Sequence, residues 1–141
     1  MSVWRRVALE KIPKLRRLIE AAPNIMALWI ELQLKLADDA LYKTPSQEKT
    51  IAGIFDYASW CLNKSHNRDT QTAVVCAFYE HLPLMDEARK DLANRLSMED
   101  FLRLRERFKY LLTDEEHEEF TREFLERKAK PDSGMQRTRT R

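Results

Sequence analysis

Glycine is scarce in this sequence, since only Gly53 and Gly134 are glycines among 141 residues. Loops that hold phosphate groups need several glycines, because the backbone N–H groups must approach the anion closely. Neither G-x-G-x-x-G nor G-x-x-x-x-G-K-[ST] occurs in the chain, so we do not expect a Rossmann or P-loop nucleotide site. The low glycine content and the many Leu, Ala, Glu, Arg and Lys residues favour helices over a sheet or barrel.

Cysteine is equally scarce, and long apolar runs are missing. Cys61 and Cys76 lie in apolar stretches without metal-binding or redox spacing, so we expect both to be reduced core residues. The longest apolar runs are shorter than the 18 residues of a membrane span. The first six residues are not followed by the hydrophobic segment of a signal peptide. These features predict a cytoplasmic protein with no membrane partner, no cofactor and no metal.

Charge is divided along the chain, although the formal net charge is only +2. Residues 1–22 and 126–141 each carry a net charge of +4, and residues 23–125 carry −6. The sequence from Ala129 onward has no apolar periodicity and contains Pro131 and Gly134, which is typical of a disordered tail. We therefore predict a single helical domain over residues 1–128 and a disordered basic tail over 129–141.

Apolar residues recur at helical spacing in about seven segments. Three starts carry capping-box patterns, in which Thr44 pairs with Gln47, Ser97 with Asp100 and Thr113 with Glu116. Residues 73–79 are apolar all round, so the helix that contains them is predicted to be central. The first helix is expected to end near residue 22, and the others to cover 24–42, 45–64, 70–82, 86–96, 98–112 and 114–128.

Short connections between these segments predict an all-α domain of antiparallel helical hairpins. The hairpins could stack as in HEAT-like proteins or close into a compact orthogonal bundle, and the sequence period does not distinguish the two.

The helix predicted over 45–64 has an unusual second face. Successive residues are 100° apart on a helix, so Gly53, Tyr57, Trp60 and Lys64 lie opposite its apolar stripe. If this face is exposed, Tyr57, Trp60 and Lys64 form a partner-binding patch. The alternative, which we favour because a seven-helix domain commonly covers both faces of one helix, is that Trp60 lies in a second layer against the first helices.

Two further groups of residues are candidate chemical sites. Tyr79, Glu80 and His81 end the predicted central helix and could line a polar pocket, and Cys61 with His81 could act as nucleophile and base. Their spacing does not require contact, and an oxyanion-hole loop is not evident, so we do not expect an enzyme. His117 lies in an acidic run without a second Glu-x-x-His, which predicts a solvated acidic face and not a metal site.

Two segments carry a resemblance. Residues 54–62 and 73–83, followed less sharply by 97–101, resemble a family of short, uncharacterised bacterial all-helical proteins. The similarity covers roughly residues 50–112. It implies a HEAT-like helical fold, and some small helical relatives look like immunity proteins that mask a toxin. The family has no established function, so the resemblance assigns no catalytic residues.

The sequence therefore favours a non-enzymatic protein-interaction module, in one form an immunity-type inhibitor whose acidic body suits a basic partner protein. One alternative is association with nucleic acid through the basic termini. A less favoured alternative is a small enzyme that uses Cys61 and His81.

Overall fold

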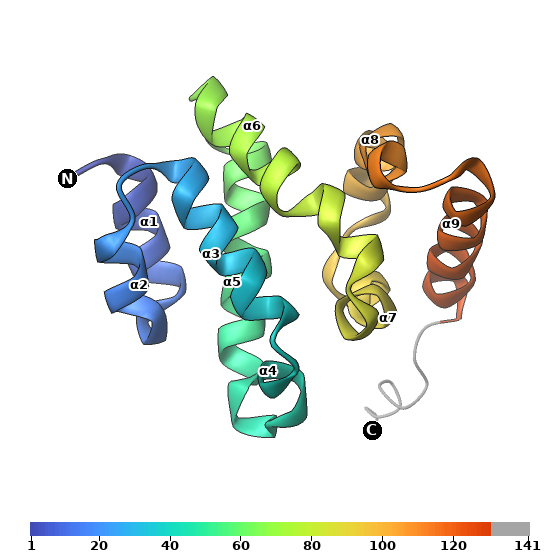
Figure 1. The fold of residues 1–141 in the computed structure, drawn as a ribbon, viewed down its shortest axis with the longest axis horizontal. Coiled ribbons are helices and arrows are strands. Elements are labelled where there is room, and N and C mark those ends of the chain that lie inside the picture. The colour runs from blue at the N-terminus through green and yellow to red at the C-terminus, as the bar shows by residue number, and fades with distance from the viewer. Residues whose placement is uncertain (131–141) are drawn as a thin grey trace.

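The computed structural model describes residues 1–130, and these residues form nine α-helices and four short 3₁₀ helices with no strand. The prediction of an all-helical fold is confirmed. In Figure 1 the helices follow one another along the longest axis, from α1 and α2 at one end to α9 at the other. The α-helices are α1 (Val3–Lys11), α2 (Arg16–Ala21), α3 (Ile25–Ala37), α4 (Asp39–Lys43), α5 (Glu48–Asn63), α6 (Arg68–Ala77), α7 (Asp86–Arg95), α8 (Met98–Phe108) and α9 (Asp114–Ala129).

The helix count exceeds the seven predicted because two long segments are interrupted. Pro13 begins a 3₁₀ helix, Pro13–Leu15, which separates α1 from α2. Proline has no N–H and starts a new turn more readily than it continues an old one. Asp38, in an extended conformation, ends α3 before the short α4 begins.

The predicted central helix also divides. We expected one helix over 70–82 that stops before Pro83, but α6 ends at Ala77 and a 3₁₀ helix, η3 (Tyr79–Leu84), continues through Pro83. This segment is nevertheless central: α6 packs against α3 and α5, and η3 packs against α7 and α8. Residues 68–84 therefore join the N-terminal and C-terminal halves of the molecule (Figure 1).

The capping-box prediction is confirmed in full at Thr113, and at Ser97 only the bond made by the cap side chain is present. Thr113 and Glu116 form both bonds of a capping box at the start of α9. The Ser97 hydroxyl accepts a hydrogen bond from the Asp100 N–H at 3.0 Å. The predicted box at Thr44 is wrong, because Thr44 makes no side-chain cap bond and Pro45–Gln47 forms a 3₁₀ turn before α5.

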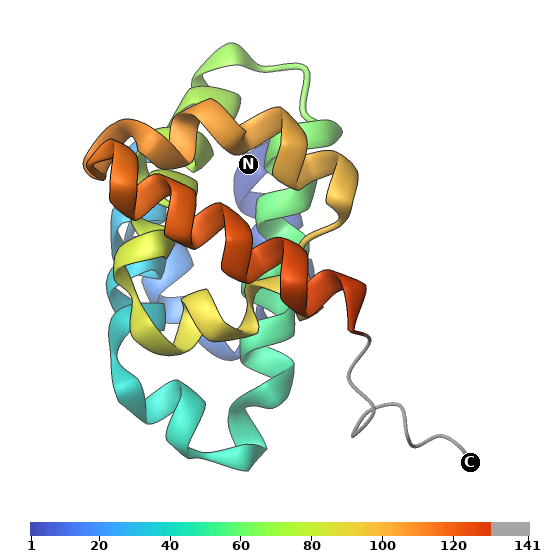
Figure 2. The same ribbon diagram turned by 90° about the vertical axis from the view of Figure 1, so that its right-hand side faces the viewer.

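Two aromatic clusters occupy the core. Trp29 stacks on Tyr57 with ring centroids 5.2 Å apart and contacts Phe78 at 4.8 Å. In the C-terminal half, Phe101 of α8 stacks on Phe124 of α9 at 3.8 Å, and Phe108 and Phe120 complete the cluster. Figure 2 shows α7, α8 and α9 together at this end. Each half therefore has its own aromatic centre.

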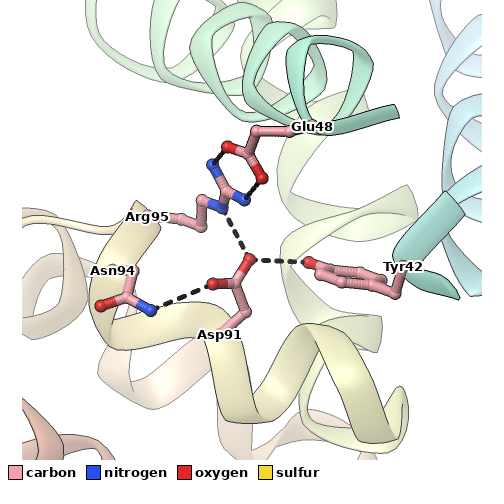
Figure 3. A network of polar contacts seen from close by, with 5 residues as sticks. All are labelled: Tyr42, Glu48, Asp91, Asn94 and Arg95. Carbon is pink, nitrogen blue, oxygen red and sulfur yellow. Dashed lines mark hydrogen bonds and ion pairs between the residues drawn. The ribbon is translucent and has the colours of Figure 1, made fainter. Parts of the chain in front are cut away.

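A polar network closes α4 and α5 onto α7 (Figure 3). Arg95 of α7 holds Glu48 of α5 through two hydrogen bonds of 2.8 Å each, and its Nε donates to Asp91 at 2.6 Å. The Tyr42 hydroxyl donates to the same Asp91 carboxylate at 3.0 Å. The hydrogen bonds from Arg95 lower the pKa of the Glu48 carboxyl. The network therefore connects α4, α5 and α7 through the Arg95 guanidinium and the Asp91 carboxylate, whose side chains are only 15% and 17% exposed.

The predicted domain end at residue 128 can be compared with the end of α9. α9 continues to Ala129, one residue past the predicted domain end, and most of the predicted tail at 129–141 lies outside the described residues. Over the described range, each helix is either too short or too polar to cross a membrane.

Candidate functional site

A pocket of about 670 Å³ lies where the start of α1, the end of α5 and the start of α6 meet. We call it the tryptophan pocket, after the two indole side chains in its wall. Its lining residues are Ser2, Val3, Trp4, Trp60, Lys64, Ser65, His66, Asn67 and Thr70.

Trp4 and Trp60 are fixed by contacts with residues outside the pocket. Trp60 stacks on Tyr57 with ring centroids 6.1 Å apart, and Tyr57 stacks in turn on the buried Trp29. The Tyr57 hydroxyl donates a hydrogen bond of 2.8 Å to the Trp4 carbonyl, which ties α1 to α5. The Arg5 guanidinium lies 4.5 Å from the centre of the Trp4 ring. Trp4 and Trp60 therefore present half-buried, preordered aromatic surface to the pocket.

The loop at the pocket mouth is also fixed by hydrogen bonds. The N–H groups of Lys64 and Ser65 both donate to the Trp60 carbonyl, at 2.8 and 3.0 Å. The Ser65 hydroxyl accepts from the Asn67 N–H, and the Asn67 side chain caps α6 by accepting from the Thr70 N–H at 3.0 Å. These bonds explain why a loop between two helices can hold Lys64 and His66 at a defined place. Both side chains are exposed there.

Lys64 is the one Lys or Arg among the described residues that line the tryptophan pocket. Lys64 and His66 contribute basic groups, and its lining contains no Asp or Glu among residues 1–130. Ser2 has the extended backbone of an N-cap, but its side chain does not cap α1, and its buried hydroxyl finds no partner within the described chain. The first turn of α1 carries no acidic residue either. The pocket therefore combines aromatic walls with a rim that favours a negative group.

The three residues predicted to bind a partner differ in their exposure to solvent. Tyr57 is fully buried, so its assignment to an exposed patch is wrong, and the two-sided packing considered as the alternative describes it. Trp60 is half-buried and lines the pocket beside Lys64. The helical wheel placed all three on one face correctly, but α1 covers the part of that face nearest Tyr57 and Gly53.

The residues predicted to line a polar pocket lie mostly in the core. Tyr79 and Glu80 are buried, and His81 is half-buried. Arg107 of α8 places its Nη2 atom 2.8 Å from the Glu80 carboxylate. Glu80 is therefore occupied by an ion pair and is not presented to a ligand.

Cys61 is not suited to act as a nucleophile. Burial raises the pKa of its thiol to about 12, so the thiol is protonated at neutral pH, whereas a nucleophilic cysteine must be a thiolate. Cys76 is half-buried, with its sulfur 3.7 Å from Arg107 Nη2, so the expectation that both cysteines lie in the core holds only for Cys61. The two cysteines are free thiols in the described structure.

His117 differs from its predicted solvated position. Its ring is buried, and Nε2 donates to the Arg105 carbonyl at 2.9 Å, although the acidic residues around it are exposed. Over residues 1–130, no group of three or more His, Cys, Asp or Glu side chains is arranged to hold a metal ion.

Sequence reasoning missed half of the tryptophan pocket. Trp4 lies in α1 and Ser2 is its N-cap, and α1 contacts α5 across more than 50 positions of sequence, which periodicity does not reveal. The available signal was that Trp4, one of only three tryptophans, begins a basic and otherwise weakly apolar helix. His66 lies in the connection between the helices predicted over 45–64 and 70–82, where periodicity carries no signal.

Comparisons with protein-family models, with curated proteins and with solved structures found no match to this chain. The resemblance seen in the sequence therefore stays a prediction.

Proposed function

We propose that the chain is a non-enzymatic protein-interaction module whose tryptophan pocket takes an apolar side chain from an acidic segment of a partner protein. The observation that carries the proposal is the pairing of Trp4 and Trp60 in a pocket rimmed by Lys64 and His66. Tryptophan is enriched among residues that dominate binding energy, especially in pockets that exclude water. The exposed Lys64 at the rim attracts negative charge on the partner and disfavours positive charge.

The arrangement of the helices supports the same proposal. We infer that the helices stack as antiparallel hairpins in a HEAT-like manner, because they follow one another along the long axis (Figure 1). Stacks of this type present extended surfaces for partners. The protonated Cys61 thiol and the occupied Glu80 carboxylate weigh against the enzyme that uses Cys61 and His81.

The acidic body of the chain predicts a basic partner, whereas the tryptophan pocket favours an acidic one. A basic partner, such as a toxin masked by an immunity-type inhibitor, would need an acidic surface, and the first turn of α9 carries Asp114, Glu115 and Glu116. The tryptophan pocket favours an acidic segment, so an inhibitor role would require the target to present one.

Fluorescence anisotropy with labelled hexapeptides tests the proposal. The peptides carry a central Leu-Phe, Leu-Trp or Met-Phe pair flanked by two acidic residues on each side. Matched peptides carry either basic flanks or a central Ser-Ser pair. We expect binding only when the apolar pair and the acidic flanks are both present, and weaker binding at high salt because the rim charges are exposed.

Variants localise the binding. Trp60→Ala should weaken it at least tenfold, which corresponds to about 1.4 kcal/mol, a conservative value for a central aromatic contact. Lys64→Glu, at an exposed position, should shift preference from acidic to basic flanks without affecting folding. Tyr110→Ala removes an aromatic that is 73% exposed outside the pocket and should leave binding within twofold. Equal binding of acidic and basic peptides, or full binding by a folded Trp60→Ala variant, would refute the proposal.

A further inference from the structure

A second pocket, of about 380 Å³, lies where the end of α1, the 3₁₀ helix after it and the start of α5 meet. We call it the lysine pocket. The antiparallel contact of α1 and α5 places the two pockets apart: Tyr57 meets Trp4 near one end of α1, and Gly53 meets Lys11 at the other. The lining residues are Lys11, Ile12, Pro13, Lys14, Lys49, Thr50, Ala52, Gly53 and Asp56.

Three lysines from three segments line this pocket. Lys11 ends α1, Lys14 lies in the 3₁₀ helix and Lys49 is in the first turn of α5. All three are exposed, and none has an ion-pair partner within 4 Å in the described structure. Asp56 is the one acidic residue in the lining, so the pocket carries a surplus of positive charge.

Helix dipoles explain only part of this arrangement. A lysine in the last turn of a helix is stabilised by the carbonyl end, as Lys11 is in α1. Lys49 lies in the first turn of α5, where a cation is disfavoured and an anion is stabilised. A bound anion would therefore interact favourably with Lys49, whereas Glu48 is the acidic residue in the same turn.

The pocket also contains a buried polar group that lacks a partner. Thr50 is only 3% exposed, and its hydroxyl has no hydrogen-bond partner in residues 1–130. Buried hydroxyls are normally hydrogen-bonded, so an unpartnered hydroxyl at the wall of a cavity leaves a hydrogen bond for a ligand to make. Ile12, Pro13 and Ala52 supply apolar wall around it.

We propose that the lysine pocket binds a small anionic ligand that carries a phosphoryl group. Three ammonium groups match the several oxygens of such a group. A volume of about 380 Å³ is at the small end of the range of ligand pockets, which suits a phosphate ester or diphosphate with a short organic part. The site is independent of the tryptophan pocket, and it would give the interaction module a second, small-molecule ligand.

Calorimetric titration of the full chain at low ionic strength tests the proposal, with inorganic pyrophosphate as one probe and a short single-stranded oligonucleotide as the other. If the site takes small ligands, the dissociation constant per binding site should be lower for pyrophosphate than for the oligonucleotide. The triple variant Lys11→Gln, Lys14→Gln, Lys49→Gln should weaken pyrophosphate binding at least tenfold. Thr50→Val, which keeps the shape of the side chain, should weaken it severalfold.

The control is the triple variant Lys35→Gln, Lys90→Gln, Lys109→Gln, which changes the net charge equally at exposed positions outside the pocket. It should bind pyrophosphate within twofold of the original chain. All six lysines are exposed, so both triple variants should fold, and circular dichroism checks this. Three results would each overturn the proposal: undetectable pyrophosphate binding, equal losses in the two triple variants, or tighter binding of the oligonucleotide.

Discussion

Gly53→Ala tests the close contact of α1 with α5, on which both pockets depend. A Cβ atom added at Gly53 would lie 2.4 Å from the Lys11 carbonyl oxygen and 3.6 Å from Ile12 Cγ1. The near atom belongs to the backbone, so it cannot turn aside as a side chain can. The hydrogen bond between Tyr57 and Trp4, one turn further along α5, restrains α1 from moving away as a whole.

Two opposing free energies set the expected result. Alanine is favoured over glycine inside a helix by about 1 kcal/mol. Overpacking of this kind costs about 1–3 kcal/mol, and a contact with backbone at 2.4 Å belongs in the upper part of that range. We therefore expect a net loss of about 1–2 kcal/mol in the free energy of unfolding. For a chain of this length the melting temperature should fall by roughly 3–8 °C.

Thermal and urea unfolding, followed by circular dichroism, measure this loss. Ala52→Gly makes the reverse change at the neighbouring position of α5, which is half-buried, and reports helix propensity in the same environment. It should cost about 1 kcal/mol. A Gly53→Ala variant that melts at a higher temperature than the original chain would show that α1 does not approach α5 as described.

Three further predictions concern the polar network and the cysteines. Arg95→Gln, which removes the partner of Glu48 and Asp91, should lower the free energy of unfolding by about 1–3 kcal/mol in urea, because Arg95 is only 15% exposed. The pKa of Glu48 is lowered in the folded state, so its contribution is present above its ordinary pKa and is lost as pH falls through the folded value. The stability difference between the original chain and Glu48→Gln, measured by urea unfolding, should therefore shrink below pH 4.5. With a thiol reagent at mild alkaline pH, Cys61 should react about 100-fold more slowly than Cys76 until the chain unfolds. The reason is that a thiol with a pKa of about 12 is almost wholly protonated at that pH. Equal reaction rates of the single cysteines in the folded Cys76→Ser and Cys61→Ser variants would contradict the burial of Cys61.

Local sequence signals predicted local structure well. The Thr113 cap, with Glu116 three residues later, forms as expected because both hydrogen bonds lie within four residues of chain. The same pattern failed at Thr44, where Pro45 favours a 3₁₀ turn and delays the α-helix. The all-round apolar stretch in 73–79 correctly indicated a central segment, but the change from α to 3₁₀ at Phe78 left no clear trace in periodicity.

The candidate site was only half predictable, because its second half depends on tertiary contacts. The helical wheel placed Tyr57, Trp60 and Lys64 on one face of α5, but a wheel does not show what covers that face. Tyr57 is buried because its hydroxyl reaches the Trp4 carbonyl on α1. Glu80 is likewise removed from the surface by Arg107, a residue of α8.

The indole N–H signals of the three tryptophans test the proposed tryptophan pocket most directly. In a ¹H–¹⁵N NMR titration with the acid-flanked Leu-Phe peptide, the signals of Trp4 and Trp60 should shift together and saturate at one affinity. The signal of Trp29, which is fully buried, should stay in place. Binding without a shift at Trp4 and Trp60, or equal shifts with the basic-flanked peptide, would contradict the account.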